Sequence, residues 1–88
     1  MMPRLNTYEL VTLGRVLRDT RRARGLSMRG AAEAAGLSKD TLWGWEAGRH
    51  KPQQFSFEAI CAVYEVSAAE LLRELYRRAE HRPYPGDA

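Results

Sequence analysis

The sequence predicts an all-α domain built from five short helices. Apolar residues recur three and four positions apart in several segments, which is the spacing of one helix face. Residues that favour helix starts precede these segments, and glycine often follows them. No stretch predicts a strand, and no internal repeat is present. The 88 residues fit one small domain with a modest core.

The first helix has two possible starts. Its apolar face predicts a helix over residues 12–24, in which Thr12 caps the start and Gly25 ends it. Asn6, with Glu9 three residues later, forms a competing capping box that would begin the helix one or two turns earlier. The sequence leaves both starts open. The face consists of Leu13, Val16, Leu17 and Thr20.

Two short helices follow and are joined by a sharp corner. Ser27 begins an alanine-rich helix that runs to Ala35, and Gly36 ends it. Glycine suits this corner because it adopts left-handed backbone conformations freely. A third helix runs from its cap at Ser38 over residues 38–47 and ends at Gly48.

The last two helices carry long apolar stripes. Ser56 precedes a fourth helix, and Ser67, with Glu70 three residues on, caps a fifth. The stripes are Phe57, Ile60, Cys61 and Tyr64 in the fourth helix, and Leu71, Leu72, Leu75 and Tyr76 in the fifth. The chain therefore divides into a lead over residues 1–11, a domain over 12–80 and a flexible tail over 81–88.

Charge is unevenly distributed along the chain. Residues 1–52 carry eight arginines and two lysines against five acids, whereas residues 53–88 carry four arginines against six acids. The first part is therefore basic and the second mildly acidic. This division favours one face that meets a polyanion and another that faces water or a second subunit. Uneven but merely solvated helix surfaces are the alternative.

Several classes of protein fit the sequence poorly. No stretch approaches the about 18 apolar residues of a membrane span, and no signal peptide is evident, so we expect a soluble, cytoplasmic protein without membrane contact. Cys61 is the single cysteine, which excludes an intrachain disulfide and a cysteine-based zinc site. His50 and His81 are isolated, so the sequence predicts no enzyme, no metal and no cofactor.

Three segments carry a family resemblance over about Leu13 to Leu72. LRDTRRARGLS, AAEAAGLSKDTLWGWEAGRHKP and ICAVYEVSAAELL follow in order with the spacing of the phage-repressor (Cro/cI, or XRE-like) helix-turn-helix family, which the chain resembles. The resemblance implies a five-helix, lambda-repressor-like DNA-binding domain. Its helix-turn-helix comprises helices 2 and 3, and the third helix is presented to the major groove of double-stranded DNA.

The resemblance also implies two sides for the third helix. Leu42 and Trp45 face the core beside Glu46, which pairs with Arg21 of the first helix. The opposite arc faces base edges, and Gly44 there lets the helix backbone approach the groove floor. The alternative is that Trp43 packs sideways against a neighbouring segment and never touches DNA. The expected base-reading residues are Lys39, Asp40, Trp43 and Gly44.

Phosphate contacts are expected around the ends of helices 2 and 3. Two residues depart from the family's pattern and leave base reading in doubt. Met28 stands where many members have glutamine and cannot bond a phosphate through its side chain, and Asp40 is repelled by phosphates unless it accepts from cytosine or has a local partner. The expected phosphate-contacting residues are Ser27, Met28, Arg29, Thr41, Arg49, His50 and Lys51.

Taken together, these features predict a small repressor that binds a palindromic operator as a homodimer. The partner contact is expected in the carboxy-terminal part, because its acidic balance is unsuited to phosphate and its apolar residues exceed the need of a small core. An antitoxin or adaptor with the same fold and a protein as its main partner is the alternative. The expected dimer residues are Gln53, Gln54, Phe55, Leu72, Leu75 and Tyr76.

Overall fold

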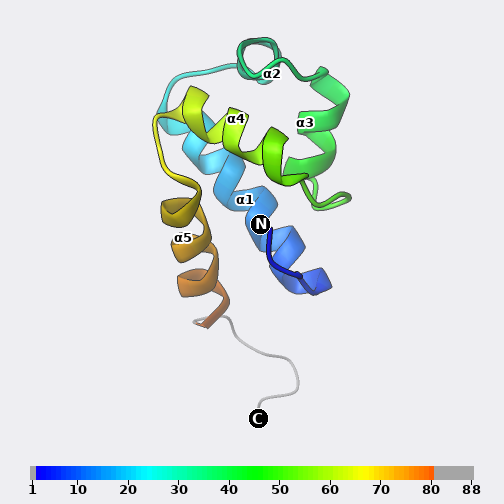
Figure 1. The fold of residues 1–88 in the computed structure, drawn as a ribbon, viewed down its shortest axis with the longest axis vertical. Helices are drawn as coiled ribbons and strands as arrows, with labels where there is room; N and C mark the ends of the chain where they lie inside the picture. Colours follow the sequence, from blue (N-terminus) through cyan, green and yellow to red (C-terminus); the bar gives the residue numbers. More distant parts are fainter. Residues whose placement is uncertain (1, 81–88) are drawn as a thin grey trace.

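The computed structural model describes residues 2–80, and the predicted flexible tail over 81–88 lies outside this part. Figure 1 shows five helices within the described residues and no strand. This confirms the predicted fold class. The helices are α1 (Thr7–Ala23), α2 (Met28–Ala34), α3 (Lys39–Glu46), α4 (Gln54–Tyr64) and α5 (Ala68–Glu80).

Helix α1 is the central element of the domain. It packs against α3 on one side and α5 on the other, while α2 rests on α3 and α4 (Figure 1). The stripe predicted for α4 is buried, and so is that of α1 except for Thr20, which is partly buried. The fully buried side chains that form the centre of the core are Leu13, Val16, Leu17, Leu42, Phe57, Ile60, Tyr64 and Leu75.

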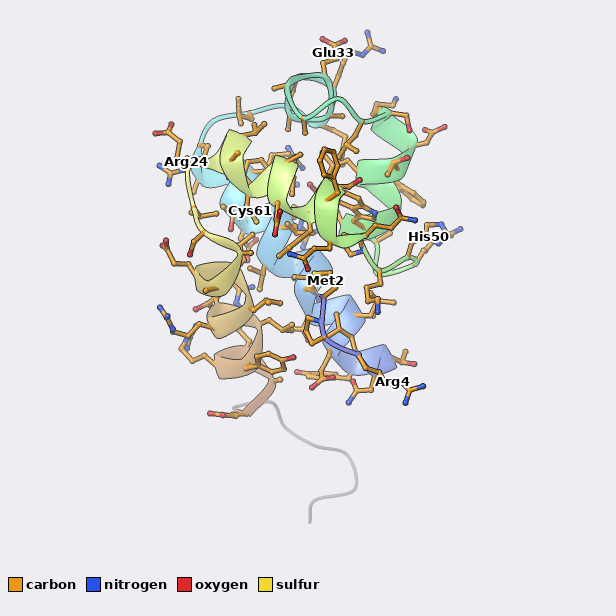
Figure 2. All side chains as sticks on the ribbon, viewed as in Figure 1. Met2, Arg4, Arg24, Glu33, His50 and Cys61 are labelled. Carbon is orange, nitrogen blue, oxygen red and sulfur yellow. The ribbon has the colours of Figure 1, made fainter. Side chains whose placement is uncertain are left out.

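The start of α1 follows the earlier of the two possibilities. Asn6 Oδ1 accepts a hydrogen bond from the Glu9 backbone N–H at 2.7 Å, and Glu9 Oε1 accepts from the Asn6 N–H at 3.0 Å. This capping box satisfies two backbone donors at the helix end. Thr12 instead lies inside the helix, where its hydroxyl donates to the Tyr8 carbonyl at 2.8 Å. Met2 is buried in the core cluster (Figure 2), so the residues before α1 pack on the domain.

The start of α4 differs from the prediction. The helix begins at Gln54, ahead of Ser56, and its N-cap is Gln53, which makes no side-chain capping bond. Ser56 therefore lies within the first turn. The preceding Pro52 is buried and Gln53 has extended backbone, so packing of the loop rather than a capping side chain determines where the helix begins.

Charged side chains join the end of α5 to α1. Arg78 Nη1 donates to Asp19 Oδ2 at 2.9 Å, and Glu74 accepts from both Arg77 and Arg78. These hydrogen bonds, first from Arg77 and then from Arg78, lower the pKa of Glu74 to about 2. All four groups are at least partly exposed, so water screens them and their contribution to stability is small.

The two tryptophans of α3 lie in opposite environments. Trp45 is 4% exposed and packs in the core, whereas Trp43 is 48% exposed. We therefore expect Trp45→Ala to lower the free energy of unfolding by about 3–5 kcal/mol, the usual cost of removing a large buried aromatic side chain. Trp43→Ala should lower it by about 1 kcal/mol or less. Urea unfolding of both variants measures the difference, and equal losses would contradict the assignment of Trp43 to the surface.

Candidate nucleic-acid interface

The α2–turn–α3 unit is built as the sequence predicts. The corner residue Gly36 has a φ of +72°, in the left-handed region that glycine adopts without strain. Ser27 Oγ caps α2 by accepting from the Gly30 N–H at 2.9 Å, and Ser38 Oγ caps α3 by accepting from the Thr41 N–H at 3.1 Å. Small alanines of α2 are buried where the helices meet. The unit therefore holds α3 at a fixed angle to α2.

One side of α3 is buried and the other is exposed. Leu42 and Trp45 point into the core. The opposite side is open to solvent over Lys39, Asp40, Trp43 and Ala47, and Thr41 is exposed nearer the Trp45 side. Of the four residues expected to read bases, the structure thus brings together three on one exposed arc. The fourth, Gly44, is buried.

Gly44 does not have the role predicted for it, which was to open the reading surface to DNA. The imidazole of His50, from the loop after α3 (Figure 2), lies over it. A Cβ at Gly44 would come within 2.7 Å of His50 Cδ2, so the missing side chain makes room for the histidine. The helical wheel of α3 alone could not reveal this, because the covering side chain comes from outside the helix. Gly44 is therefore part of the packing between α3 and its loop.

The C-terminal end of α3 approaches α1 unusually closely, which the sequence reasoning missed. A Cβ at Gly14 of α1 would lie 2.5 Å from the carbonyl oxygens of both Trp45 and Glu46. Gly48, with a φ of +74°, in turn sits against Val11, whose Cα would be 2.9 Å from an added Cβ. Gly14 lies within the amphipathic pattern of the first helix, where glycine costs helix stability. Its presence there could have indicated a close approach of another backbone.

Arg21 and Glu46 form a buried ion pair between α1 and the end of α3. Arg21 Nε donates to Glu46 Oε2 at 2.8 Å and Nη2 donates to Oε1 at 3.0 Å, while Nη1 donates to the Leu26 carbonyl at 2.9 Å. The two side chains are 10% and 5% exposed. Hydrogen bonding to Glu46 raises the pKa of Arg21, and burial opposes this effect. The bidentate pair fixes the orientation of α3 on α1.

Arg49 stacks on the exposed tryptophan. Its guanidinium carbon lies 4.9 Å from the centroid of the Trp43 ring. This distance is within the range of a cation–π contact. Trp43 is therefore partly covered by the loop after α3, as the alternative interpretation of its packing anticipated, yet about half of its surface remains exposed.

The residues expected to contact phosphate occupy both ends of the helix-turn-helix. Ser27, Arg29 and Lys51 are exposed, whereas Met28 is partly buried and packs against the core. Thr41 Oγ1 is 2.8 Å from Ser38 Oγ. A hollow of about 230 Å³ beside Trp43 is lined by arginines 18, 21 and 22 together with Met28, Glu46 and Ala47. Arginines of α1 thus lie beside Trp43 on the exposed arc of α3, and one of them, Arg21, is paired with Glu46.

The residues expected at a dimer contact do not share one environment. Phe55 is 83% exposed at the start of α4, and Tyr76 is also exposed on α5. Leu72 is partly buried against the core. Leu75 is fully buried, so the prediction that it contacts a partner is wrong. A side chain enclosed in the monomer core offers no surface to a partner. The amphipathic pattern of α5 could not show which of its apolar residues the core encloses and which it leaves exposed.

The described residues offer little for thiol chemistry or metal binding. Cys61 is buried in α4 (Figure 2), and burial raises the pKa of its thiol to about 11, so the reactive thiolate is scarce at neutral pH. Within residues 2–80 no group of three or more His, Cys, Asp or Glu side chains could hold a metal ion. None of the helices there has the length and apolar character needed to cross a bilayer.

A helix-turn-helix domain model matches residues 12–75, well over half of the chain. The chain belongs to the helix-turn-helix domain family. This match spans α2, the turn at Gly36 and α3, together with the helices that support them. It agrees with the family resemblance found in the sequence, and a comparison with curated protein sequences gave no significant match.

Solved structures share the fold of this helix-turn-helix domain. The clp gene regulator ClgR from Corynebacterium glutamicum superposes with a TM-score of 0.75 at 29% identity, over 78% of this chain and 73% of that one. The restriction-modification controller protein C.AhdI from Aeromonas hydrophila gives 0.71 at 28% identity, over 73% and 97%. Wild-type controller protein C.Esp1396I gives 0.77 at 19% identity, over 88% and 100%, a likeness of fold alone. The domain has the fold of helix-turn-helix transcription regulators.

The ion pair should couple α3 to the stability of the whole domain. Glu46→Ala leaves the Arg21 guanidinium buried without its carboxylate, so we expect a loss of about 3 kcal/mol or more in the free energy of unfolding. The double variant Arg21→Met/Glu46→Leu replaces both charges by apolar groups and should lose less than Glu46→Ala. Urea unfolding measures both. Measured in the same way, a double variant whose loss equals the sum of the losses in Arg21→Met and Glu46→Leu would show that the pair is not coupled.

Proposed function

We propose that this protein is a sequence-specific DNA-binding transcriptional regulator that represses by occupying an operator. The observation that carries the proposal is the division of α3: its rear is fixed by Leu42, Trp45 and Glu46, and its exposed arc lies beside arginines of α1. The similar structures of a gene regulator and a restriction-modification controller support the same role. We propose a binding protein rather than an enzyme, acting at the chromosome in the cytoplasm.

The exposed arc offers chemistry suited to base edges in the major groove. Lys39 can donate to the O6 and N7 acceptors of guanine, and Asp40 can accept from the amino group of cytosine. Trp43 presents an apolar edge to a thymine methyl group. All three are exposed and lie on one side of α3. The proposed base-reading set is therefore Lys39, Asp40 and Trp43, without Gly44.

Phosphates on either side of the groove are proposed to position the helix. The hydroxyl of Ser27 accepts from the Gly30 N–H, so its own proton remains available to a phosphate oxygen. Arg29 and Lys51 are exposed at opposite ends of the helix-turn-helix. Thr41, Arg49 and His50 complete the proposed set, and Met28 can contribute only its backbone N–H. Such contacts supply affinity without sequence information.

If the protein binds DNA through phosphates, its affinity should depend on salt concentration in a defined way. Selection of bound sequences from random duplex DNA should return a defined site, and the logarithm of its association constant should fall linearly with the logarithm of salt concentration. The slope is about 0.9 per neutralised phosphate. Fluorescence anisotropy titrations at several salt concentrations measure it. Failure to enrich any sequence, with duplex binding absent even at low salt, would overturn the proposal in favour of a protein partner.

We also propose that two copies bind one operator. A single helix-turn-helix reads few base pairs and buries too little surface to compete with nonspecific sites, whereas a two-fold dimer places two recognition helices about 34 Å apart. Phe55 supports this proposal, since a phenylalanine exposed to this degree leaves a large apolar surface in water. Gln53, Gln54, Leu72 and Tyr76 complete the proposed contact.

The stoichiometry on DNA tests the dimer. Sedimentation of the protein with its selected duplex should give two protomers on an approximately palindromic site. Phe55→Glu should favour a single protomer and weaken binding, because it places a charge in the contact. Glu65→Gln, at the exposed C-terminal end of α4 and outside the proposed contact, is the matched control and should leave the stoichiometry unchanged. One protomer on a non-palindromic site, at high protein concentration, would exclude the dimer.

A further inference from the structure

The loop after α3, comprising Gly48 to Lys51, folds back onto the recognition helix. The Arg49 N–H donates to the Gly44 carbonyl at 2.9 Å, and the His50 ring lies over the same glycine. Gly48 is in contact with Val11 of α1. These three contacts come from neighbouring residues and restrain the backbone on both sides of Arg49. The base of the Arg49 side chain is therefore fixed relative to α3, and only its long side chain retains freedom.

The remaining freedom is limited by Trp43. The Arg49 guanidinium stacks at 4.9 Å from the ring centroid, and Trp43 itself projects from the exposed arc of α3. Because the N–H donors of a guanidinium lie in its own plane, a guanidinium held over the face of a ring keeps donors free for other acceptors. Within residues 2–80 Arg49 forms no ion pair with a carboxylate. Its donors therefore remain available to acceptors outside the protein.

We propose that Trp43 is a positioning residue for Arg49. By stacking, Trp43 holds the guanidinium beside α3, ready to bind paired acceptor atoms on DNA, either phosphate oxygens or the O6 and N7 edge of a guanine. The inference rests on the proposed DNA-binding function. It changes the role of Trp43: much of what this side chain contributes to binding passes through Arg49 rather than through its own contact with a base.

The physical basis is the ordering of a flexible side chain. A free arginine must lose rotamer freedom when it binds DNA, whereas a stacked one has already lost much of it. An exposed cation–π contact corresponds to about a two- to fivefold bias toward the stacked arrangement. Removing the ring should therefore weaken DNA binding by a factor of this order through Arg49 alone. The same loss should vanish when Arg49 is already absent.

A double-mutant cycle on DNA affinity tests this dependence. The proteins are wild type, Trp43→Ala, Arg49→Ala and the double variant, each titrated with the selected duplex and with an unrelated one. We expect the double variant to bind only slightly more weakly than Arg49→Ala alone, and clearly more tightly than the product of the two single losses would give. Trp43→Phe should retain most of the affinity, because phenylalanine preserves an aromatic face. Lys51→Ala is the matched control: it removes a neighbouring charge, and its loss should multiply with that of Trp43→Ala.

The outcomes separate the possible sources of the effect. Equal losses on both duplexes, with a salt slope reduced by about 0.9 in Arg49→Ala but nearly unchanged in Trp43→Ala, identify a phosphate. A loss confined to the selected duplex identifies a guanine. A double variant whose loss is the product of the two single losses would overturn the proposal and make Trp43 an independent DNA contact.

A measurement without DNA distinguishes failure of the stack from failure of the proposed function. In the free protein the Trp43 ring current should shift the side-chain proton resonances of Arg49, and Trp43→Ala should abolish the shift. If Arg49 shows no such shift while the wild type binds DNA, the positioning role is wrong and the proposed function stands. If the wild type binds no duplex at all, the proposed function fails, and the role of Trp43 on DNA fails with it.

Discussion

The attachment of α3 to α1 is the constraint on which the rest of the interface depends. The two backbones meet where Gly14 has no side chain, at a distance that any Cβ would violate, and the bidentate Arg21–Glu46 pair closes the same contact. Glycine here permits the approach, and the buried pair selects one rotation of α3, because any other rotation would leave two charges without partners. The side of α3 that faces the core is thus fixed before any DNA is present.

Once the rear of α3 is fixed, its exposed arc follows from helix geometry. At about 100° per residue, burial of Leu42 and Trp45 places Trp43 on the opposite side, and the same rotation turns Lys39 and Asp40 outward. The loop after α3 then completes the surface from outside the helix. Its histidine covers Gly44 and its arginine stacks on Trp43. The proposed reading surface is therefore composite, with one part from the helix and one part from the loop.

Local patterns predicted most of the fold, and long-range packing explains where they failed. Ser27, Ser38 and Gly36 act within a few residues of their partners, so their roles could be predicted from spacing alone. The environment of Gly44 is set by a side chain outside its helix, and the start of α4 by a buried loop, which periodicity within one helix cannot report. The apolar stripe of α5 contains buried and exposed residues alike, so the sequence pattern could not show that Leu75 belongs to the core.

The central claim is that α3 meets DNA with the Trp43 side while the Trp45 side stays in the core. The two indole N–H groups are an internal pair of reporters, one for each side of the same helix. Heteronuclear NMR of the labelled protein during titration with its selected duplex measures both at once. We expect a large change in the Trp43 resonance with little change at Trp45. Unchanged Trp43, with perturbations confined to α4 and α5, would contradict it.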